Sequence, residues 1–423
     1  MILGVSKLKI TPQTPLRLCG YAFRSTAYDK VCEDIYLRVH IQKANGQKLV
    51  FIYADFLWWN FDFVKKARIM LKKEFGFSEE QVFFVASHNH SGPPTGSCFL
   101  SALEIADEGY SLFLMEQIKR GVALAMADME QVAAYRYDGI CDINVFRRKK
   151  TGDEIKMLPN TEIAADKSLT LLRYEKANGE IKAITAHYSC HANVANSNEL
   201  QPDYAGIALG MLDEHYGGVS MFLQGCTADL RPANIDENGR FASGDYNTAK
   251  QFADTFYKAC VATFKKTAIL INEAADIKHV QIKLPLQNLK SENDLEKMLS
   301  SGSDMDREWA QKVLEKQNRN YETLDIGSIS YGEGLLILTF NAEVSQGYAQ
   351  FARNICPQSI CVGYTNGMIG YLCSKAQINE GGYEPWGSAK YFALAGTFAP
   401  ECEEKVFSGM GSVVIRNSSA KKA

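Results

Sequence analysis

The chain has 423 residues, of which 46 are Lys or Arg and 49 are Asp or Glu, for a formal net charge of −3. Hydrophobic residues make up 46% and charged residues 22%, so nearly the whole chain can bury a core, and a mainly disordered protein is excluded. The basic side chains are scattered along the chain, so we expect no face that follows a phosphate backbone and no nucleic-acid partner.

The amino-terminal segment meets Lys7 before any apolar run of signal-peptide length, and no later stretch has the apolar length of a membrane span. The eleven cysteines are irregularly spaced, and none forms a Cys-x-x-Cys pair. We therefore expect no membrane span, reduced and mostly buried thiols, and a cytoplasmic location.

The first third of the chain alternates buried strands with an amphipathic helix. We predict strands at 35–42, 49–54 and 81–87, and a helix at 61–75. Asp55 and His88 directly follow two of these strands. Polar residues at the carboxyl ends of buried strands are typical of α/β proteins.

The same alternation continues to the carboxyl end. We predict strands at 135–145, 169–175, 181–188, 219–223, 334–340 and near 364–372, helices at 110–129 and 247–265, and a charged, peripheral helical stretch at 293–321. No repeat or linker is visible, which predicts one α/β domain over 1–416 and a flexible tail over 417–423.

Histidines follow two of the predicted strands. His88 and His90 are one residue apart, so their side chains can point to the same side of the chain, and Ser91-Gly92-Pro93-Pro94 turns the chain directly afterwards. This geometry suits a metal ligand with an acid–base partner, although His-x-His alone also fits imidazoles in a core or a cap. His187 and His191 flank Cys190 after another strand. Of the two, His191 fits a ligand, and His187 fits a core position.

Three further candidates lie in the carboxyl-terminal third. Glu343 follows a buried strand, where a carboxylate serves equally well as a metal ligand or as the first residue of a helix. Tyr371 and Tyr383 belong to a set of twenty tyrosines, for which packing is the ordinary role.

Together these positions resemble one family. Ser87-His88-Asn89-His90-Ser91-Gly92-Pro93 resembles the Thr-His-Thr-His-Ser-Gly-Pro motif of the neutral, non-lysosomal ceramidases and their bacterial relatives. Further matches occur in the family's order over most of residues 1–405: Ile10-Thr11-Pro12, Tyr53-Ala54-Asp55, Asn144-Val145-Phe146-Arg147-Arg148, Asp203-Tyr204-Ala205-Gly206, Asn366-Gly367-Met368-Ile369-Gly370-Tyr371 and Gly382-Tyr383-Glu384.

The resemblance implies a layered α-β-β-α fold, with mixed sheets flanked by helices, and a zinc-dependent hydrolase that cleaves an amide bond. The implied zinc ligands are His88, His191, Glu343 and Tyr371, and the implied catalytic residues are His90, Arg147 and Tyr383. Water activated by the metal would attack the carbonyl, His90 would carry the proton to the leaving group, and Arg147 and Tyr383 would stabilise the oxyanion.

The sequence departs from the family where ceramidases have Gly-Asp-x-Ser-Pro, because the matching segment is Ala228-Asp229-Leu230-Arg231-Pro232. Arg231 replaces the serine, which disfavours a serine nucleophile. Arg231 would either present a fork to a substrate carboxylate or phosphate, as a further catalytic-site residue, or form a surface ion pair with Asp229.

The chain also has no room for the carboxyl-terminal β-sandwich of ceramidases, so we expect a small soluble substrate rather than ceramide. Two alternatives stay open: a zinc- or ligand-binding protein of the same fold without activity, and a hydrolase of phosphate or other esters. The sequence does not indicate an oligomeric state.

Overall fold

The larger sheet is mixed and has nine strands in the part of the chain that the computed structural model describes, residues 1–44, 46–271 and 275–414. In sheet order the strands are β12 (Val219–Gln224), β10 (Ile181–Tyr188), β9 (Ser168–Lys176), β6 (Glu130–Ile140), β1 (Ile2–Lys9), β3 (Tyr36–Ala44), β4 (Gln47–Ala54) and β5 (Val82–Ala86), with β14 (Ile269–Leu270) paired to β6. Only β10–β12 and β4–β5 are parallel pairs among these described strands. The two ends of this order, β12 and β5, also contact each other.

A second mixed sheet lies beside the first. Its strands are, in order, β19 (Ser359–Val362), β17 (Leu335–Phe340), β16 (Tyr321–Tyr331), β15 (Ala275–Gln287) and β21 (Thr397–Phe398). Strands β17 and β19 are parallel, and the other pairs are antiparallel. His88 lies just after β5, and His191 and Glu343 lie three residues after the ends of β10 and β17.

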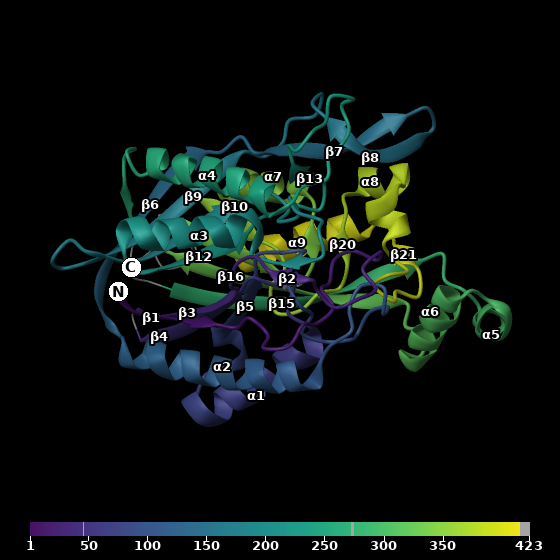
Figure 1. The fold of residues 1–423 in the computed structure, drawn as a ribbon, viewed down its shortest axis with the longest axis horizontal. Coiled ribbons are helices and arrows are strands. Elements are labelled where there is room, and N and C mark those ends of the chain that lie inside the picture. The colour runs from purple at the N-terminus through teal and green to yellow at the C-terminus, as the bar shows by residue number, and fades with distance from the viewer. Residues whose placement is uncertain (45, 272–274, 415–423) are drawn as a thin grey trace, which may run out of the picture.

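Helices flank these sheets, as Figure 1 shows. They are α1 (Phe61–Phe75), α2 (Glu108–Ala127), α3 (Asp203–Tyr216), α4 (Tyr246–Thr263), α5 (Glu292–Ser301), α6 (Asp304–Glu315), α7 (Gln346–Ile355), α8 (Lys375–Glu380) and α9 (Cys402–Val414). Helix α2 packs on β1 and β3, α3 on α4 and β12, and α9 on β15 and β16. The prediction of mixed sheets flanked by helices is therefore confirmed.

Short elements frame the site. Three small strand groups are β2 (Lys30–Val31) with β11 (Glu199–Leu200), β13 (Leu230–Pro232) with β7 (Asn144–Thr151) and β8 (Glu154–Asn160), and β18 (Glu343–Val344) with β20 (Tyr371–Leu372). Two single turns are η1 (Glu79–Gln81) and the π-helical η2 (Tyr383–Gly387).

The alternation of side chains along the central strands builds two apolar cores. On β4, Val50 and Ile52 belong to the core with α1 and α2, whereas Phe51 and Tyr53 belong to the core with α3 and α4. Burial on both faces explains why 49–54 reads as a continuous apolar run rather than as an alternating one.

Three predicted elements were wrong in their extent. Near 364–372, only Tyr371–Leu372 forms a strand, β20. The strand predicted at 135–145 is divided between β6 and β7, and the helical stretch predicted at 293–321 is two helices followed by the start of β16. The backbone N–H of Gly302 caps α5 by donating to the Met298 carbonyl, and Ser303 begins α6 by accepting a hydrogen bond from the backbone N–H of Asp306. The tail predicted at 417–423 lies outside the described residues, and the single domain over 1–416 stays a prediction.

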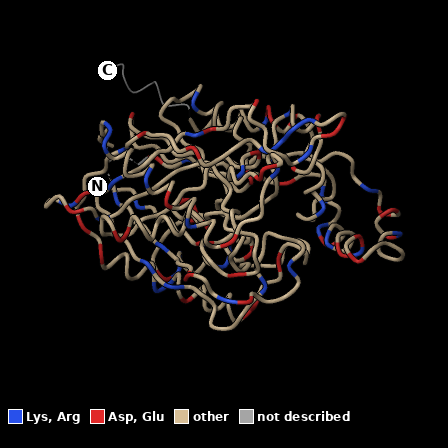
Figure 2. Tube along the Cα trace, turned by 45° about the horizontal axis from the view of Figure 1, so that its top comes forward, with Lys and Arg blue, Asp and Glu red and all other residues tan. Residues whose placement is uncertain are grey.

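The described residues contain no helix that is long and apolar enough to cross a membrane. Acidic and basic residues are mixed along the whole trace in Figure 2, including helices α5 and α6 at the right-hand end.

Buried polar side chains hold the ends of the strands together. The Nε2 atom of Gln224 donates to the carbonyls of Ser87 and Cys190, each at 2.8 Å, and so connects the segments that lead to His88 and His191. The fully buried Asn89 donates from Nδ2 to the carbonyls of Asp55 and Gln201, at 3.0 and 2.8 Å, and accepts from the Ser91 backbone N–H at 2.8 Å.

We expect Asn89→Leu to lower the free energy of unfolding by about 3 kcal/mol, because it leaves two buried carbonyls and one N–H without their partner. Urea denaturation of the purified variant measures this change. The matched control is Asn247→Leu on the exposed surface of α4, which should change stability by less than about 0.5 kcal/mol. Equal stability of the two variants would contradict the anchoring role of Asn89.

Candidate functional site

Three histidines from two strand ends meet at one point. His88 follows β5 with a φ of 61°, a left-handed conformation that is unfavourable for a residue with a Cβ. His191 lies just beyond β10, and the backbone N–H of His90 donates to the carbonyl of Ala192 at 3.0 Å, so the two loops are joined. The ring centroids of His88 and His191 are 4.5 Å apart, and those of His88 and His90 are 4.8 Å apart.

A backbone carbonyl faces the Nδ1 atom of each ring. His88 Nδ1 is 3.1 Å from the Leu57 carbonyl, His90 Nδ1 is 3.2 Å from the Gly20 carbonyl, and His191 Nδ1 is 2.9 Å from the Leu230 carbonyl. A carbonyl only accepts hydrogen bonds, so we assign the ring proton to Nδ1 in all three residues. Each Nε2 then carries a lone pair, and these lone pairs point to a common centre.

Burial keeps the imidazoles of His90 and His191 neutral. Desolvation, reinforced by the neighbouring His88 and His191 rings, lowers the pKa of His90 well below its usual range. Desolvation and the Arg147 charge lower the pKa of His191 to about 3. Near pH 7 both residues therefore offer lone pairs rather than protons.

Glu343 reaches the same centre from the short strand β18. It pairs directly with Tyr371 in the β18–β20 ladder, and its Oε1 lies 2.9 Å from His191 Nε2 and 3.6 Å from His88 Nε2. Burial raises the pKa of this carboxyl, but its electrostatic and hydrogen-bonding contacts with His88 and His191 lower it by more, so that the pKa lies well below its usual range. We assign the negative charge to Glu343, because Arg147 Nη2 is only 3.9 Å from Oε1.

The arrangement fits a metal ion. One ring nitrogen from each of His88, His90 and His191 lies within 4.8 Å of the others. Glu343 Oε1 is buried and has no partner with acceptable hydrogen-bond geometry among the described residues. His88 Nε2 and His90 Nε2 face each other at 3.3 Å, a distance at which two lone pairs repel unless a cation or a proton lies between them. A cation would satisfy all of these atoms at once.

Arg147 crosses the site from β7 and is almost completely buried. Its Nη1 lies 3.1 Å from His191 Nε2, and its Nη2 donates to the Tyr371 hydroxyl at 3.2 Å. Its Nε donates to Glu384 Oε1 at 2.8 Å. Since His191 Nε2 has one lone pair, a metal that binds there must replace the contact with Arg147.

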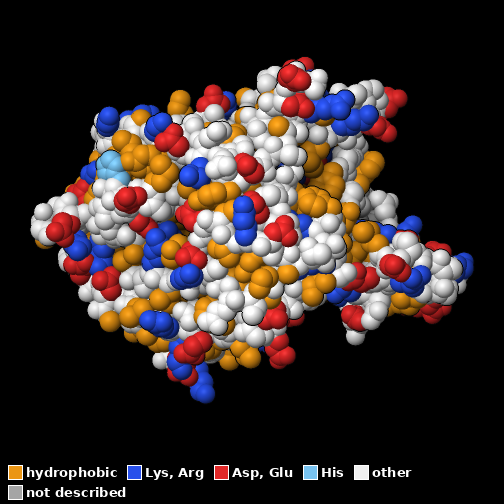
Figure 3. Space-filling view, viewed as in Figure 1, with side chains coloured by type: hydrophobic (Ala, Val, Ile, Leu, Met, Phe, Trp, Pro, Cys, Tyr) orange, Lys and Arg blue, Asp and Glu red, His pale blue; other side chains and the backbone are white. Residues whose placement is uncertain are grey.

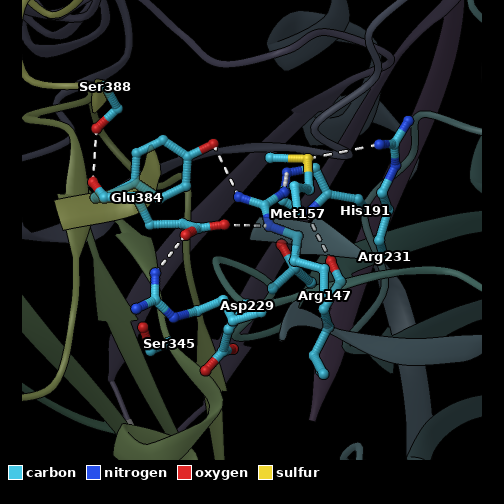
Figure 4. A network of polar contacts seen from close by, with 12 residues as sticks. Arg147, Met157, His191, Asp229, Arg231, Ser345, Glu384 and Ser388 are labelled. Atoms are coloured by element: carbon cyan, nitrogen blue, oxygen red, sulfur yellow. Dashed lines mark hydrogen bonds and ion pairs between the residues drawn. The ribbon is translucent and has the colours of Figure 1, made fainter. Parts of the chain in front are cut away.

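Glu384 holds two arginines in place, as Figure 4 shows. It accepts from Arg147 through Oε1, and Oε2 accepts from Arg148 Nη1 at 2.5 Å. Arg148 also donates to Glu380 and to the Gly381 carbonyl. In the sequence, Glu384 stands out only as the last residue of the Gly382-Tyr383-Glu384 motif. Its place beside Tyr383, together with the Arg147-Arg148 pair in another motif, was the one available signal.

The two candidate tyrosines differ in their surroundings. Tyr371 is buried beside Arg147, and desolvation raises the pKa of its hydroxyl well above the usual range. Without a cation, Tyr371 is therefore a neutral phenol rather than a phenolate. Tyr383 packs edge-to-face on Tyr371 with centroids 5.8 Å apart, and it is 37% exposed at the edge of the site.

Arg231 does not form the ion pair with Asp229 that was one of its two expected roles. Asp229 accepts from the Gln346 backbone N–H at 2.9 Å and from Gln377 Nε2 at 2.7 Å, so its carboxylate is already used inside the protein. Arg231 is half-buried on β13 and points to Met157 Sδ at 3.6 Å and to the Phe241 ring at 4.8 Å. His187 is a core histidine, as predicted, and bonds to the Cys361 carbonyl at 2.8 Å.

Sequence reasoning missed the aromatic residues that enclose His88. The Tyr364 ring stacks on it at 4.0 Å, and the Tyr364 hydroxyl bonds to Thr227 Oγ1 at 2.5 Å. The Trp58 ring lies on another side at 6.2 Å and donates to buried Glu104 at 3.0 Å. Neither aromatic residue lies in a motif with a chemical signature, so packing alone reveals them.

Two cavities lie elsewhere on the molecule. One of about 670 Å³ is lined by residues of α1, α2 and α6 with the loop around Cys98, and one of about 580 Å³ lies between α1, β16 and Phe392. Neither is lined by the three histidines. The convergence of lone pairs and charges, rather than cavity volume, therefore identifies the candidate site.

Comparisons with solved structures agree with this fold. The neutral ceramidase from Pseudomonas aeruginosa superposes with a TM-score of 0.74 and 15% sequence identity, over 98% of this chain and 73% of that one. A ceramidase complexed with C2 gives a TM-score of 0.75 and 15% identity, over 97% of this chain and 74% of that one. No family model and no curated protein matches the sequence. The chain therefore has a neutral ceramidase-like fold, as its motifs predicted.

We expect Glu384→Gln to lower the free energy of unfolding by about 3 kcal/mol, because the buried guanidinium groups of Arg147 and Arg148 then lose the carboxylate that they share. The matched control is Glu380→Gln, which removes the contact of a 51% exposed carboxylate with Arg148 and should cost less than about 1 kcal/mol. Chemical denaturation of both variants measures the difference, and similar losses in the two would argue against a central role for Glu384.

Glu104 should make stability depend on pH. Burial raises the pKa of its carboxyl to about 7 from 4.5, so the folded protein binds this proton more tightly than the unfolded chain does. Its contribution to stability is complete below about pH 4.5 and is lost as the pH rises through about 7, an effect of about 3 kcal/mol. Urea denaturation between pH 4.5 and 8 should show this loss for the wild type relative to Glu104→Gln. Parallel curves would contradict it.

Proposed function

We propose that this protein is a zinc-dependent hydrolase that cleaves an amide bond of a small, soluble N-acyl compound. The observation that carries the proposal is the convergence of imidazole lone pairs on the Glu343 carboxylate at a buried centre. The Nδ1 atoms of the three rings donate to backbone carbonyls, which leaves the Nε2 atoms as acceptors. A single cation would interact favourably with these acceptors together. The neutral ceramidase-like fold supports an amide hydrolase over other uses of such a site.

In this proposal His88, His191, Glu343 and Tyr371 hold the zinc ion. Two neutral imidazoles and a carboxylate are ordinary zinc ligands, whereas a tyrosine must lose its proton, which a nearby dication favours. When bound, the ion acts as a Lewis acid that polarises a carbonyl and lowers the pKa of water to about 7. The net reaction adds one water across the C–N bond and releases a carboxylic acid and an amine.

The remaining residues bind the substrate and move protons. His90 keeps its Nδ1 proton on the Gly20 carbonyl, so Nε2 is free to accept a proton from water and to donate it to the amine that leaves. Arg147 and Tyr383 place N–H and O–H donors beside the site, where negative charge develops on the carbonyl oxygen. Glu384 keeps the Arg147 guanidinium oriented.

The eleven free cysteines support a further part of the proposal, a reducing compartment such as the cytoplasm. The substitution of Arg231 for the family's serine supports hydrolysis without a serine nucleophile. A phosphate- or ester-cleaving reaction would use the same cation and arginines, so the substrate profile decides between these chemistries.

The first test is metal content after dialysis. We expect about one zinc ion per chain in the wild type and less than about a tenth of that in His88→Ala and His191→Ala, because each variant removes an inward lone pair. His215→Ala is the matched control, since His215 is exposed and contacts Tyr257 and Tyr216 instead. Wild-type protein that takes up no zinc after reconstitution would overturn the proposal.

Two further variants separate binding from catalysis. Glu343→Ala should lose zinc, whereas His90→Ala should keep it and hydrolyse N-acyl substrates at least 100-fold more slowly. Loss of zinc in His90→Ala would make His90 a ligand instead of a proton carrier. Full zinc content without turnover of any amide or ester would favour the inactive binding protein.

A further inference from the structure

Arg231 is a half-buried arginine without an acidic partner. No carboxylate among the described residues lies within 4.0 Å of its guanidinium, and its contacts include the Met157 sulfur at 3.6 Å, the Phe241 ring at 4.8 Å and the Tyr21 hydroxyl. Arg147 and Arg148, in contrast, share Glu384. A partly desolvated cation that is paired only with weak acceptors is unfavourable unless a ligand supplies the anion.

This arginine adjoins the histidine cluster through the backbone. It follows Leu230, whose carbonyl accepts the hydrogen bond from His191 Nδ1 at 2.9 Å. In the β13–β7 pair it lies opposite Val145, which precedes Arg147 by two residues. In Figure 4, Arg231 and Glu384 lie on opposite sides of Arg147 and His191. The Arg231 guanidinium therefore lies on the side of the site away from Glu384, whose carboxylate pairs with Arg147 and Arg148 instead.

Tyr21 connects Arg231 to His90. Its ring packs on the His90 ring with centroids 5.0 Å apart, and its hydroxyl interacts electrostatically with Arg231. On the other side, Arg24 lies 4.7 Å above the Tyr21 ring and donates only to backbone carbonyls, those of Cys19, His90 and Ser197. Two cations therefore flank Tyr21 with no carboxylate in contact, in a chain whose formal net charge is −3.

Apolar groups border the same region. Phe23 stacks on Tyr21 at 5.1 Å and is 66% exposed, and Met157 is 36% exposed beside Arg231. Figure 3 shows hydrophobic side chains gathered over the region between the β7–β8 hairpin and α6. A ligand that binds here would meet the Arg231 guanidinium, the Tyr21 hydroxyl and the apolar side chains of Phe23 and Met157.

We propose that the substrate carries a carboxylate a few bonds from the amide, as an N-acylated amino acid does, and that Arg231 binds this carboxylate beside Tyr21. The inference rests on the proposed function, because it places the amide at the histidine cluster. The Arg231 fork matches the two carboxylate oxygens, and a single tyrosine side chain separates it from His90. Arg231 is thus a specificity-determining residue that selects charged substrates over neutral amides.

The test uses the full chain reconstituted with zinc and matched pairs of probes: the N-acetyl and N-octanoyl derivatives of leucine and the corresponding leucinamides. We expect the wild type to bind the carboxylates at least 30-fold more tightly than the amides in titration calorimetry, and to hydrolyse them with a similar advantage in kcat/KM. Arg231→Gln should weaken binding of the carboxylates about 10- to 100-fold, mainly through KM, and leave the amides unchanged. Arg231→Lys should recover part of the loss.

The control is Arg240→Gln, an exposed arginine in the loop beyond β13, which should leave both probes unchanged. Equal binding of acids and amides by the wild type, or an equal loss for both in Arg231→Gln, would overturn the inference, and so would failure to bind any of the acids. Binding of the acids that depends on Arg231, without hydrolysis of any probe, would support the anion site and contradict the hydrolase. The two proposals therefore fail in distinguishable ways.

Discussion

The candidate site depends on three hydrogen bonds that fix histidine tautomers. The carbonyls of Leu57, Gly20 and Leu230 hold the Nδ1 protons of His88, His90 and His191, and this leaves each Nε2 as an acceptor, which at His191 faces Arg147 Nη1. Without those carbonyls the rings could share protons with one another and satisfy themselves. With them, the buried centre collects electron pairs that only a cation or a proton can stabilise.

The surrounding strands hold the histidine segments in position. The curled larger sheet brings the ends of β5 and β12 into contact, and Gln224 joins the segments before His88 and His191. The small β18–β20 pair then contributes Glu343 and Tyr371 as directly opposed residues. Because these side chains lie at or near strand ends inside packed cores, the geometry of the centre is set by the two cores rather than by mobile loops.

Charge is distributed unequally around the centre. On one side, Glu384 neutralises Arg147 and Arg148 within the protein. On the other side, Arg24 and Arg231 contact carbonyls, a sulfur and aromatic rings, and no carboxylate balances them among the described residues. In the proposed function, this asymmetry orients the substrate, with its uncharged acyl part facing Tyr383 and its anionic part facing Tyr21.

The sequence by itself determined most strands of the larger sheet, strand β17, helices α1, α2 and α4, and the residues at these strand ends, because buried strands read as apolar runs and His88, His191 and Glu343 lie within three residues of them. The order of the family motifs then indicated that these residues belong to one site. The sequence could not reveal Glu384, Trp58 or Tyr364, whose roles arise from contacts between segments more than a hundred residues apart or from ring packing with no motif. Nor could it decide between two roles for Arg231. Only the tertiary structure, in which the Asp229 carboxylate accepts from Gln377 and from the backbone of Gln346, leaves Arg231 without a carboxylate in contact among the described residues, since competition for a buried acceptor is settled in three dimensions.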